Sequence, residues 1–187
     1  MVLAAAGASP AAAATQVFVG GELAGANGVT VGGATYNVEF VEGTCAGVFG
    51  GCDNASVDFT FQNLTDATAA GDALFAQVIT GTVDTDPSLT LGCSSSTLCG
   101  MLIPYALGGA PVMFSAYAAN NGAVANFNGG TVGGTPASFD TTIQSAFVWA
   151  RFTPVTAVPE PSSWAMILLG FGGLGLAMRR RKTTALA

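Results

Sequence analysis

The sequence predicts an all-β body, a β-sandwich of the jelly-roll-like type, followed by a single short transmembrane helix near the C-terminus. Three observations support this prediction. Glycine accounts for 26 of the 187 residues and only 9% of the residues are charged, which suits short strands and tight turns better than a helical bundle. Many segments alternate apolar and polar residues with the two-residue period of a strand. A short apolar run late in the chain is followed by consecutive cations.

Alternation locates the clearest strands. Residues 55–62 place Val57, Phe59 and Phe61 on one face of a half-buried strand, and residues 34–43 alternate in the same way. The other expected strands are residues 16–20, 74–83, 88–92, 101–107, 111–118 and 143–152. Turns are expected at Asn27-Gly28, Gly32-Gly33, Gly108-Gly109, Asn121-Gly122 and Gly133-Gly134. Short strands joined by glycine-rich turns are typical of a sandwich.

Two segments are less regular. Residues 122–136 are expected to form a flexible loop or an irregular strand pair. Residues 65–75 are the one plausible helix, but Gly71 argues against it, so a loop or a short helical turn is expected there. Pro104 cannot donate a hydrogen bond to a strand ladder, and we expect it at a sheet edge or a bulge.

Four cysteines occur in two local pairs, which indicates disulfides if the body is exported. Three pairings are open, and we favour Cys45–Cys52 with Cys93–Cys99 because short loops close easily. Free buried thiols are the alternative. A zinc site is disfavoured, because neither pair has the two-residue spacing of zinc ligands.

Charge excludes several function classes. Residues 15–158 hold ten carboxylates and one arginine, Arg151, a balance of −9 that phosphate backbones would repel. Histidine is absent, and the one lysine, Lys182, lies in the tail, so neither a Ser–His nor a Ser–Lys pair is available within the body. No phosphate-binding or dinucleotide-binding motif is present. We therefore expect no enzyme, no cofactor and no nucleic-acid partner.

Two sets of residues are candidates for ligand binding. Asp84 and Asp86 lie two residues apart beside Pro87 and are candidate calcium ligands, although a solvated turn is the alternative. Four aromatic residues are candidates for stacking on sugar rings, with core packing as the alternative: Tyr36, Tyr105, Tyr117 and Trp149.

Residues 1–14 resemble the second half of a secretory signal peptide. Ala12-Ala13-Ala14 before Thr15 matches an A-x-A cleavage site, but a positive leading region and a full apolar region are missing. We therefore expect the true start codon to lie upstream. The alternative is a disordered alanine-rich leader.

The C-terminal residues divide into a Pro-rich linker at 157–163, an apolar segment at 164–178 and a basic tail at 179–187. A helix over the apolar segment would be roughly 22 Å long, short for a hydrocarbon core of roughly 30 Å. By the positive-inside rule the basic residues would remain cytoplasmic and the body would lie outside. These basic residues are Arg179, Arg180, Arg181 and Lys182.

This end of the chain resembles a PEP-CTERM sorting signal, in its PEPxxWA variant. The resemblance is carried by Pro159-Glu160-Pro161, by Trp164-Ala165, by the glycine-rich apolar run and by the terminal arginines, about 25 residues in all. It implies a Gram-negative bacterial protein that is exported across the inner membrane and recognised there by exosortase. It also implies an association with exopolysaccharide, biofilm and floc formation. The motif residues would then be the site of a substrate and not of an enzyme.

These observations predict an exported, non-enzymatic protein. After an inner-membrane intermediate, the body at residues 15–156 would reach the cell surface or the medium as a structural part of the exopolysaccharide matrix. Its expected partners are exosortase, the export machinery and exopolysaccharide. One alternative is a carbohydrate- or calcium-binding module of that matrix, and another is a secreted hydrolase that uses carboxylates alone.

Overall fold

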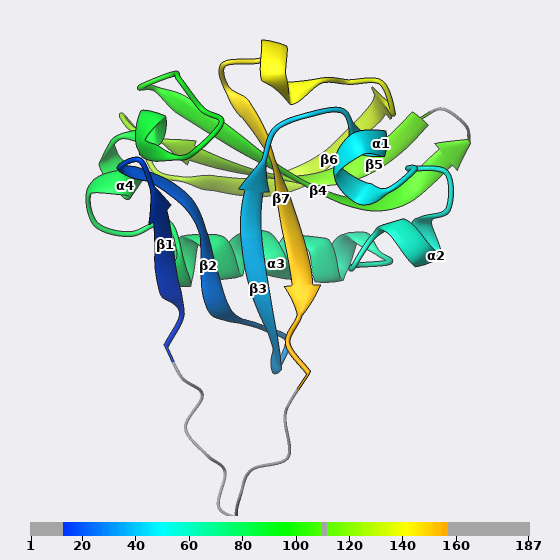
Figure 1. Cartoon of the computed structure of the whole chain (residues 1–187), viewed down its shortest axis with the longest axis horizontal. Helices are drawn as coiled ribbons and strands as arrows, with labels where there is room; N and C mark the ends of the chain where they lie inside the picture. The colour runs from blue at the N-terminus through cyan, green and yellow to red at the C-terminus, as the bar shows by residue number, and fades with distance from the viewer. Residues whose placement is uncertain (1–12, 110–111, 157–187) are drawn as a thin grey trace, which may run out of the picture. The chain divides into compact units, whose positions relative to one another are not determined.

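The computed structural model describes residues 13–109 and 112–156, and all the strands in it belong to one mixed sheet (Figure 1). The strand order is β1-β2-β3-β7-β4-β5-β6. Neighbouring strands are antiparallel except β4 and β7, which are parallel. The strands are β1 (Thr15–Val19), β2 (Glu22–Val31), β3 (Ala34–Val41), β4 (Leu98–Gly109), β5 (Val112–Asn121), β6 (Phe127–Pro136) and β7 (Phe147–Pro154).

The prediction of a sheet-rich body is confirmed, whereas the sandwich is not, because the described strands form one sheet and not two facing sheets. Expected strands at 16–20, 34–43, 101–107, 111–118 and 143–152 correspond to β1, β3, β4, β5 and β7. The ladder between β4 and β5 changes register between Pro104 and Ala106, so Pro104 lies at a bulge, as predicted.

Four α-helices and two 3₁₀ turns lie among the described residues. They are α1 (Cys45–Phe49), α2 (Ala55–Asp58), α3 (Leu64–Gln77), α4 (Thr82–Thr85), and the 3₁₀ turns η1 (Pro87–Leu89) and η2 (Thr141–Ile143). Of these, α2, α4 and η1 overlap segments where strands were predicted. No helix among the described residues is both long and apolar enough to cross a membrane. The predicted transmembrane segment, residues 164–178, lies outside the described residues.

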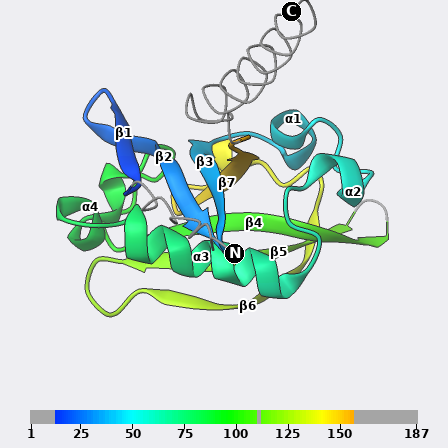
Figure 2. The ribbon, with the colours of Figure 1, turned by 90° about the horizontal axis from the view of Figure 1, so that it is seen from below.

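The prediction of a loop or a short helical turn at 65–75 is wrong, because α3 is a helix of 14 residues. The side chain of Asn63 caps it by accepting a hydrogen bond from the Asp66 amide at 2.9 Å. Its buried side is made of small residues and Leu74, and Figure 2 shows the helix running alongside β4, β5 and β6. The buried residues of α3 are Ala67, Ala70, Gly71, Ala73 and Leu74.

Gly71 marks the closest approach of α3 to β6. A Cβ atom at this position would lie 2.6 Å from Asn128 Oδ1. Asn128 Nδ2 donates to Thr68 O at 2.8 Å and to Asp72 Oδ1 at 2.6 Å, which ties the helix to the edge strand. The glycine that argued against a helix therefore leaves room for the Asn128 side chain, which bonds to α3.

Three strand predictions in this half of the chain are wrong. Residues 55–62 begin as α2, and Val57 is 75% exposed, whereas Phe59 and Phe61 are buried. The alternation there comes from an extended segment in which Phe59 and Phe61 pack into two different apolar cores, which are described below. The predicted strand at 74–83 contains the end of α3 and the start of α4, and the one at 88–92 overlaps η1.

Two predicted turns lie inside strands. Asn27-Gly28 falls within β2, where the ladder to β3 changes register between Ala26 and Val29. Gly28 has a φ of 79°, a left-handed conformation that suits this bulge. Gly133-Gly134 falls within β6, so residues 122–136, predicted as a flexible loop or an irregular strand pair, contain a ten-residue edge strand.

The two faces of the sheet carry separate apolar cores. The larger core packs α3 against β2, β3, β4, β5 and β7, with Leu23, Leu74 and Met101 fully buried. The second core, on the opposite face, surrounds Trp149 and includes Leu102, Met113 and the Cys45–Cys52 pair.

The strands β1, β2, β3 and β7 run side by side, so the sheet has two distinct ends (Figure 1). One end holds the turn between β2 and β3 and the last residues of β7, because Val31 pairs with Ala34 and Tyr36 pairs with Pro154. We call this the exit end. The other end, the pocket end, holds the turn between β1 and β2 and the pairing of Val41 with Trp149.

Candidate functional site

The predicted sorting residues Pro159, Glu160, Pro161, Trp164 and Ala165 lie outside the described residues, as do the basic tail and leader residues 1–12. The chain divides into two compact units, Met1–Val155 and Thr156–Ala187. The sheet itself holds the described chain up to this boundary, since the Val155 amide donates to Thr35 O at 2.9 Å.

Both predicted disulfides are present. Cys45 pairs with Cys52, and Cys93 pairs with Cys99, with Cα–Cα separations of 6.0 and 5.7 Å. The first closes the loop around α1, and the second ties the segment after η1 to the start of β4. All four cysteines of the chain are thereby paired.

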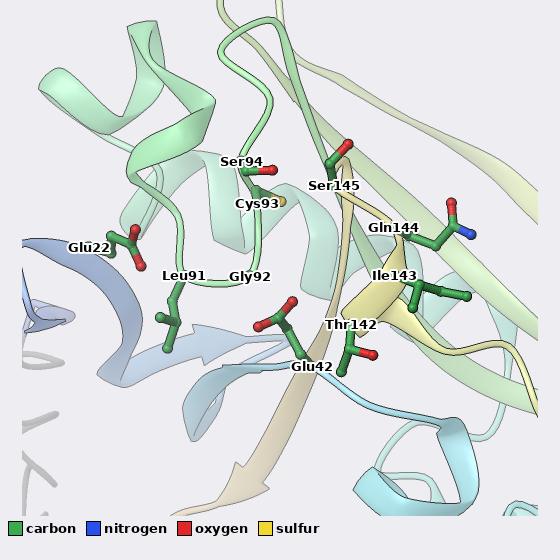
Figure 3. Close-up of a pocket in the computed structure, with 10 residues that line it drawn as sticks. All are labelled: Glu22, Glu42, Leu91, Gly92, Cys93, Ser94, Thr142, Ile143, Gln144 and Ser145. Atoms are coloured by element: carbon green, nitrogen blue, oxygen red, sulfur yellow. The ribbon is translucent and has the colours of Figure 1, made fainter.

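A polar pocket of about 380 Å³ opens at the pocket end of the sheet (Figure 3). It is lined by the Leu91–Ser94 segment, by Thr142–Ser145 before β7, and by two glutamates. Backbone hydrogen bonds position both segments: the Leu91 amide donates to Leu23 O at 2.9 Å, and the Ser94 amide donates to Ser145 O at 2.9 Å. The glutamates are Glu22, at the start of β2, and Glu42, just after β3.

Gly92 shapes the floor of this pocket. Its φ is 86°, and a Cβ atom there would lie 2.7 Å from Glu42 Cγ and 2.9 Å from Val148 Cγ2. Only glycine therefore lets the backbone pass beneath the Glu42 side chain. The second disulfide begins at the next residue, Cys93, and restrains the same loop.

The two pocket carboxylates have no cation beside them. Arg151 is the one cationic side chain in the described residues, and it forms its ion pair with Glu39. In Figure 3 the Leu91–Gly92 loop is drawn between the side chains of Glu22 and Glu42. Carboxylates beside hydroxyl and amide groups can bind a ligand rich in hydroxyl groups.

The predicted calcium ligands make local hydrogen bonds. Asp84 Oδ1 accepts from Asn126 Nδ2 at 2.6 Å. Asp86 Oδ1 accepts from the Ser88 amide at 3.2 Å and its hydroxyl at 2.6 Å, and so caps η1. The described residues contain no group of three or more histidine, cysteine or acidic side chains placed to hold a metal ion. These contacts favour the turn interpretation over a calcium site.

The four aromatic candidates do not form one platform. Trp149 is fully buried, and its Nε1 donates to Gly43 O at 2.8 Å. Tyr36 and Tyr105 pack against the core on the α3 face, whereas Tyr117 and Trp149 belong to the core on the opposite face. Burial raises the pKa of the Tyr117 hydroxyl above its ordinary value. Core packing, the alternative named above, is what the structure shows for Trp149.

Sequence reasoning missed the pocket, because its lining comes from four separate parts of the chain. Neither Glu22 nor Glu42 is singled out by the residues around it in the sequence. The one local signal is Gly92 directly before Cys93, which marks a tight, cross-linked loop.

A comparison with protein families identifies the C-terminal segment. A family described as a PEP-CTERM protein-sorting motif matches residues 157–182, which include every residue on which the resemblance was based. No curated protein and no solved structure matches the chain significantly. The match spans the prolines, the Trp-Ala pair, the apolar run and the basic residues in one continuous stretch. The chain therefore carries a PEP-CTERM protein-sorting motif at its C-terminal end.

Proposed function

We propose that this protein is an exosortase substrate whose acidic, sheet-rich body acts outside the cytoplasm as a non-enzymatic structural part of an exopolysaccharide matrix. The observation that carries the proposal is the sorting motif at 157–182, which begins two residues after Val155, the last residue held by the sheet. The export machinery would deliver the chain to the inner membrane. Exosortase would process it near Pro159-Glu160-Pro161, and the body would then reach the cell surface or the medium.

The disulfides support the export step. Two disulfides and no free thiol are typical of proteins that fold in an oxidising compartment such as the periplasm. A reducing cytoplasm would leave these cysteines as thiols.

A structural role is supported by the chemistry that the body lacks. The sequence has no histidine, and no lysine lies within the described residues, so the serines that line the pocket have neither a histidine nor a lysine to activate them as a Ser–His or Ser–Lys pair would. Polar groups without a nucleophile–base pair suit adhesion to a hydrated polymer better than bond cleavage.

The test follows the C-terminus of the full chain, expressed from its native start in a host that contains an exosortase. Intact masses are measured for protein from the membrane and from the medium. The native chain should lose its tail and leave the membrane, whereas a Pro159→Ala, Glu160→Ala, Pro161→Ala triple variant should remain full length. A Ser162→Ala, Ser163→Ala variant, changed inside the same motif, should be processed normally. Full-length native protein in the membrane would contradict the proposal.

A second candidate function is a carbohydrate-binding module of the same matrix, which the polar pocket favours. Its hydroxyl-bearing residues Ser94, Thr142 and Ser145 line the same pocket as Glu22 and Glu42, whose carboxylates have no counter-ion among the described residues. Depletion of the protein on beads of exopolysaccharide from the host should then depend on Glu42. A Glu42→Gln variant should bind several-fold more weakly, and Asp53→Asn, an exposed acid outside the pocket, should bind normally. Equal retention of both variants would exclude the pocket as the binding site.

A further inference from the structure

The described chain leaves the sheet at a surface that carries no charge. This exit surface consists of Gly32–Thr35, in the turn between β2 and β3, and Thr153–Val155, at the end of β7. All of these residues are exposed, and none has a charged side chain. The nearest charges along the two strands, Glu39 and Arg151, form an ion pair with each other. In Figure 1 the acidic helix α3 is set back from this end of the strands.

The distance from this surface to the sorting motif is fixed by the length of the chain. Val155 is anchored by its hydrogen bond to Thr35 O at 2.9 Å, and Pro154 is paired with Tyr36. Four residue steps separate Val155 from Pro159, and even a fully extended chain covers at most about 14 Å in four steps. Any processing event near Pro159 therefore takes place within about 14 Å of the exit surface.

An enzyme that binds its substrate as an extended peptide needs several residues on each side of the reacting bond. At about 3.3 Å per residue, four residues on the N-terminal side of Pro159 already reach Val155. The folded body then has to lie against the enzyme throughout the reaction.

We propose that the exit surface is the docking surface for the membrane-bound processing transpeptidase, an inference that rests on the proposed function. The shape of the exit surface allows a second protein to approach it closely. Gly32 and Gly33 have open space around them, Ala34 and Thr35 are small, and Val155 exposes 43% of an apolar side chain. With no carboxylate on the surface, the negative charge of the body stays away from the enzyme and from the anionic headgroups around it.

The experiment measures the rate of tail removal from the full chain in an exosortase host, after a pulse of labelled synthesis. Ala34→Arg and Ala34→Glu each place a long charged side chain on the exit surface. Val57→Arg and Val57→Glu are the matched controls in α2, outside the exit surface, where the native side chain is 75% exposed. Thermal unfolding of the purified proteins verifies that all four variants fold.

Both Ala34 variants should be processed about fivefold more slowly or worse, a loss of about 1 kcal/mol, because a long charged side chain on the exit surface would hold the body away from the enzyme. The Val57 variants should match the native rate. Inserting six Gly and Ser residues between Thr156 and Ala157 adds about 20 Å of reach and should restore processing of the Ala34 variants.

Three results would overturn the inference. Native rates for both Ala34 variants would show that the surface makes no contact. A slow Glu variant with a normal or faster Arg variant would assign the surface to anionic lipid headgroups instead. Slow processing that the insertion does not relieve would place the defect elsewhere. If the native chain itself keeps its tail, the proposed function fails, whatever the variants do.

Discussion

Replacing Leu74 by alanine tests whether α3 forms one side of the main core. Leu74 is fully buried in α3, and its carbonyl accepts hydrogen bonds from Val78 and Ile79 at 2.8 Å. The change removes three buried carbon atoms, and losing the favourable free energy of their burial costs about 2.4 kcal/mol. A cavity that does not collapse adds up to about 2 kcal/mol. The free energy of unfolding should therefore fall by about 2.5–4 kcal/mol.

The same helix supplies a matched control. Leu64, its first residue, is 37% exposed, so truncating it removes less buried surface and leaves no closed cavity. Leu64→Ala should cost about 1–1.5 kcal/mol. The assay is urea unfolding of the full chain in mild detergent, followed by near-ultraviolet circular dichroism, with the slope m compared among variants. Losses that agree within about 0.5 kcal/mol would refute the packing of α3 described above.

Three further predictions concern stability. Replacing Cys93 and Cys99 by alanine, at a sequence separation of 6, should lower the free energy of unfolding by about 2.4 kcal/mol in the same urea assay. Because burial raises the Tyr117 pKa, the unfolded chain loses that proton first as the pH rises through about 10, and stability falls. The urea midpoint of Tyr117→Phe should therefore drop less than that of the native protein between about pH 9 and about pH 11, and equal drops would contradict this. Gly71→Ala should destabilise the protein despite better helix propensity, and Asn128→Ala should relieve most of that cost in a double-mutant cycle.

The alternation of apolar and polar residues predicts a strand correctly where one face of the strand is buried and the other is exposed to solvent. In β3, Val38 and Phe40 are 2% and 3% exposed, whereas Glu39 between them is exposed, so the pattern of residues 34–43 reports the real environment. The same pattern failed at 55–62, because two buried rings in an unpaired extended segment have the same spacing as two residues of a strand. The two-residue period alone does not distinguish a hydrogen-bonded strand from an unpaired extended segment that packs against a core.

The disulfide pairing was predictable because it depends on local loop closure. The pocket was not, because Glu22, Gly92 and Thr142 are far apart in the sequence and meet only through the crossover that places β7 between β3 and β4. Likewise, a sandwich and a single sheet covered by a helix give the same strand signals. They differ in what covers each face, and that depends on contacts distant in sequence.

The contact between Gly71 and Asn128 explains two errors at once. Close packing requires the helix to present glycine and alanine, so the helix lacks the large apolar stripe that normally identifies it. β6, in turn, is an edge strand rich in glycine, and its amide at Asn128 reaches the helix backbone instead of adding an apolar residue to an alternating pattern. The close contact between α3 and β6 therefore removes from each element the apolar pattern by which it would be predicted. Small residues in two distant, poorly patterned segments are in this chain the mark of a close helix–strand contact and not of a flexible loop.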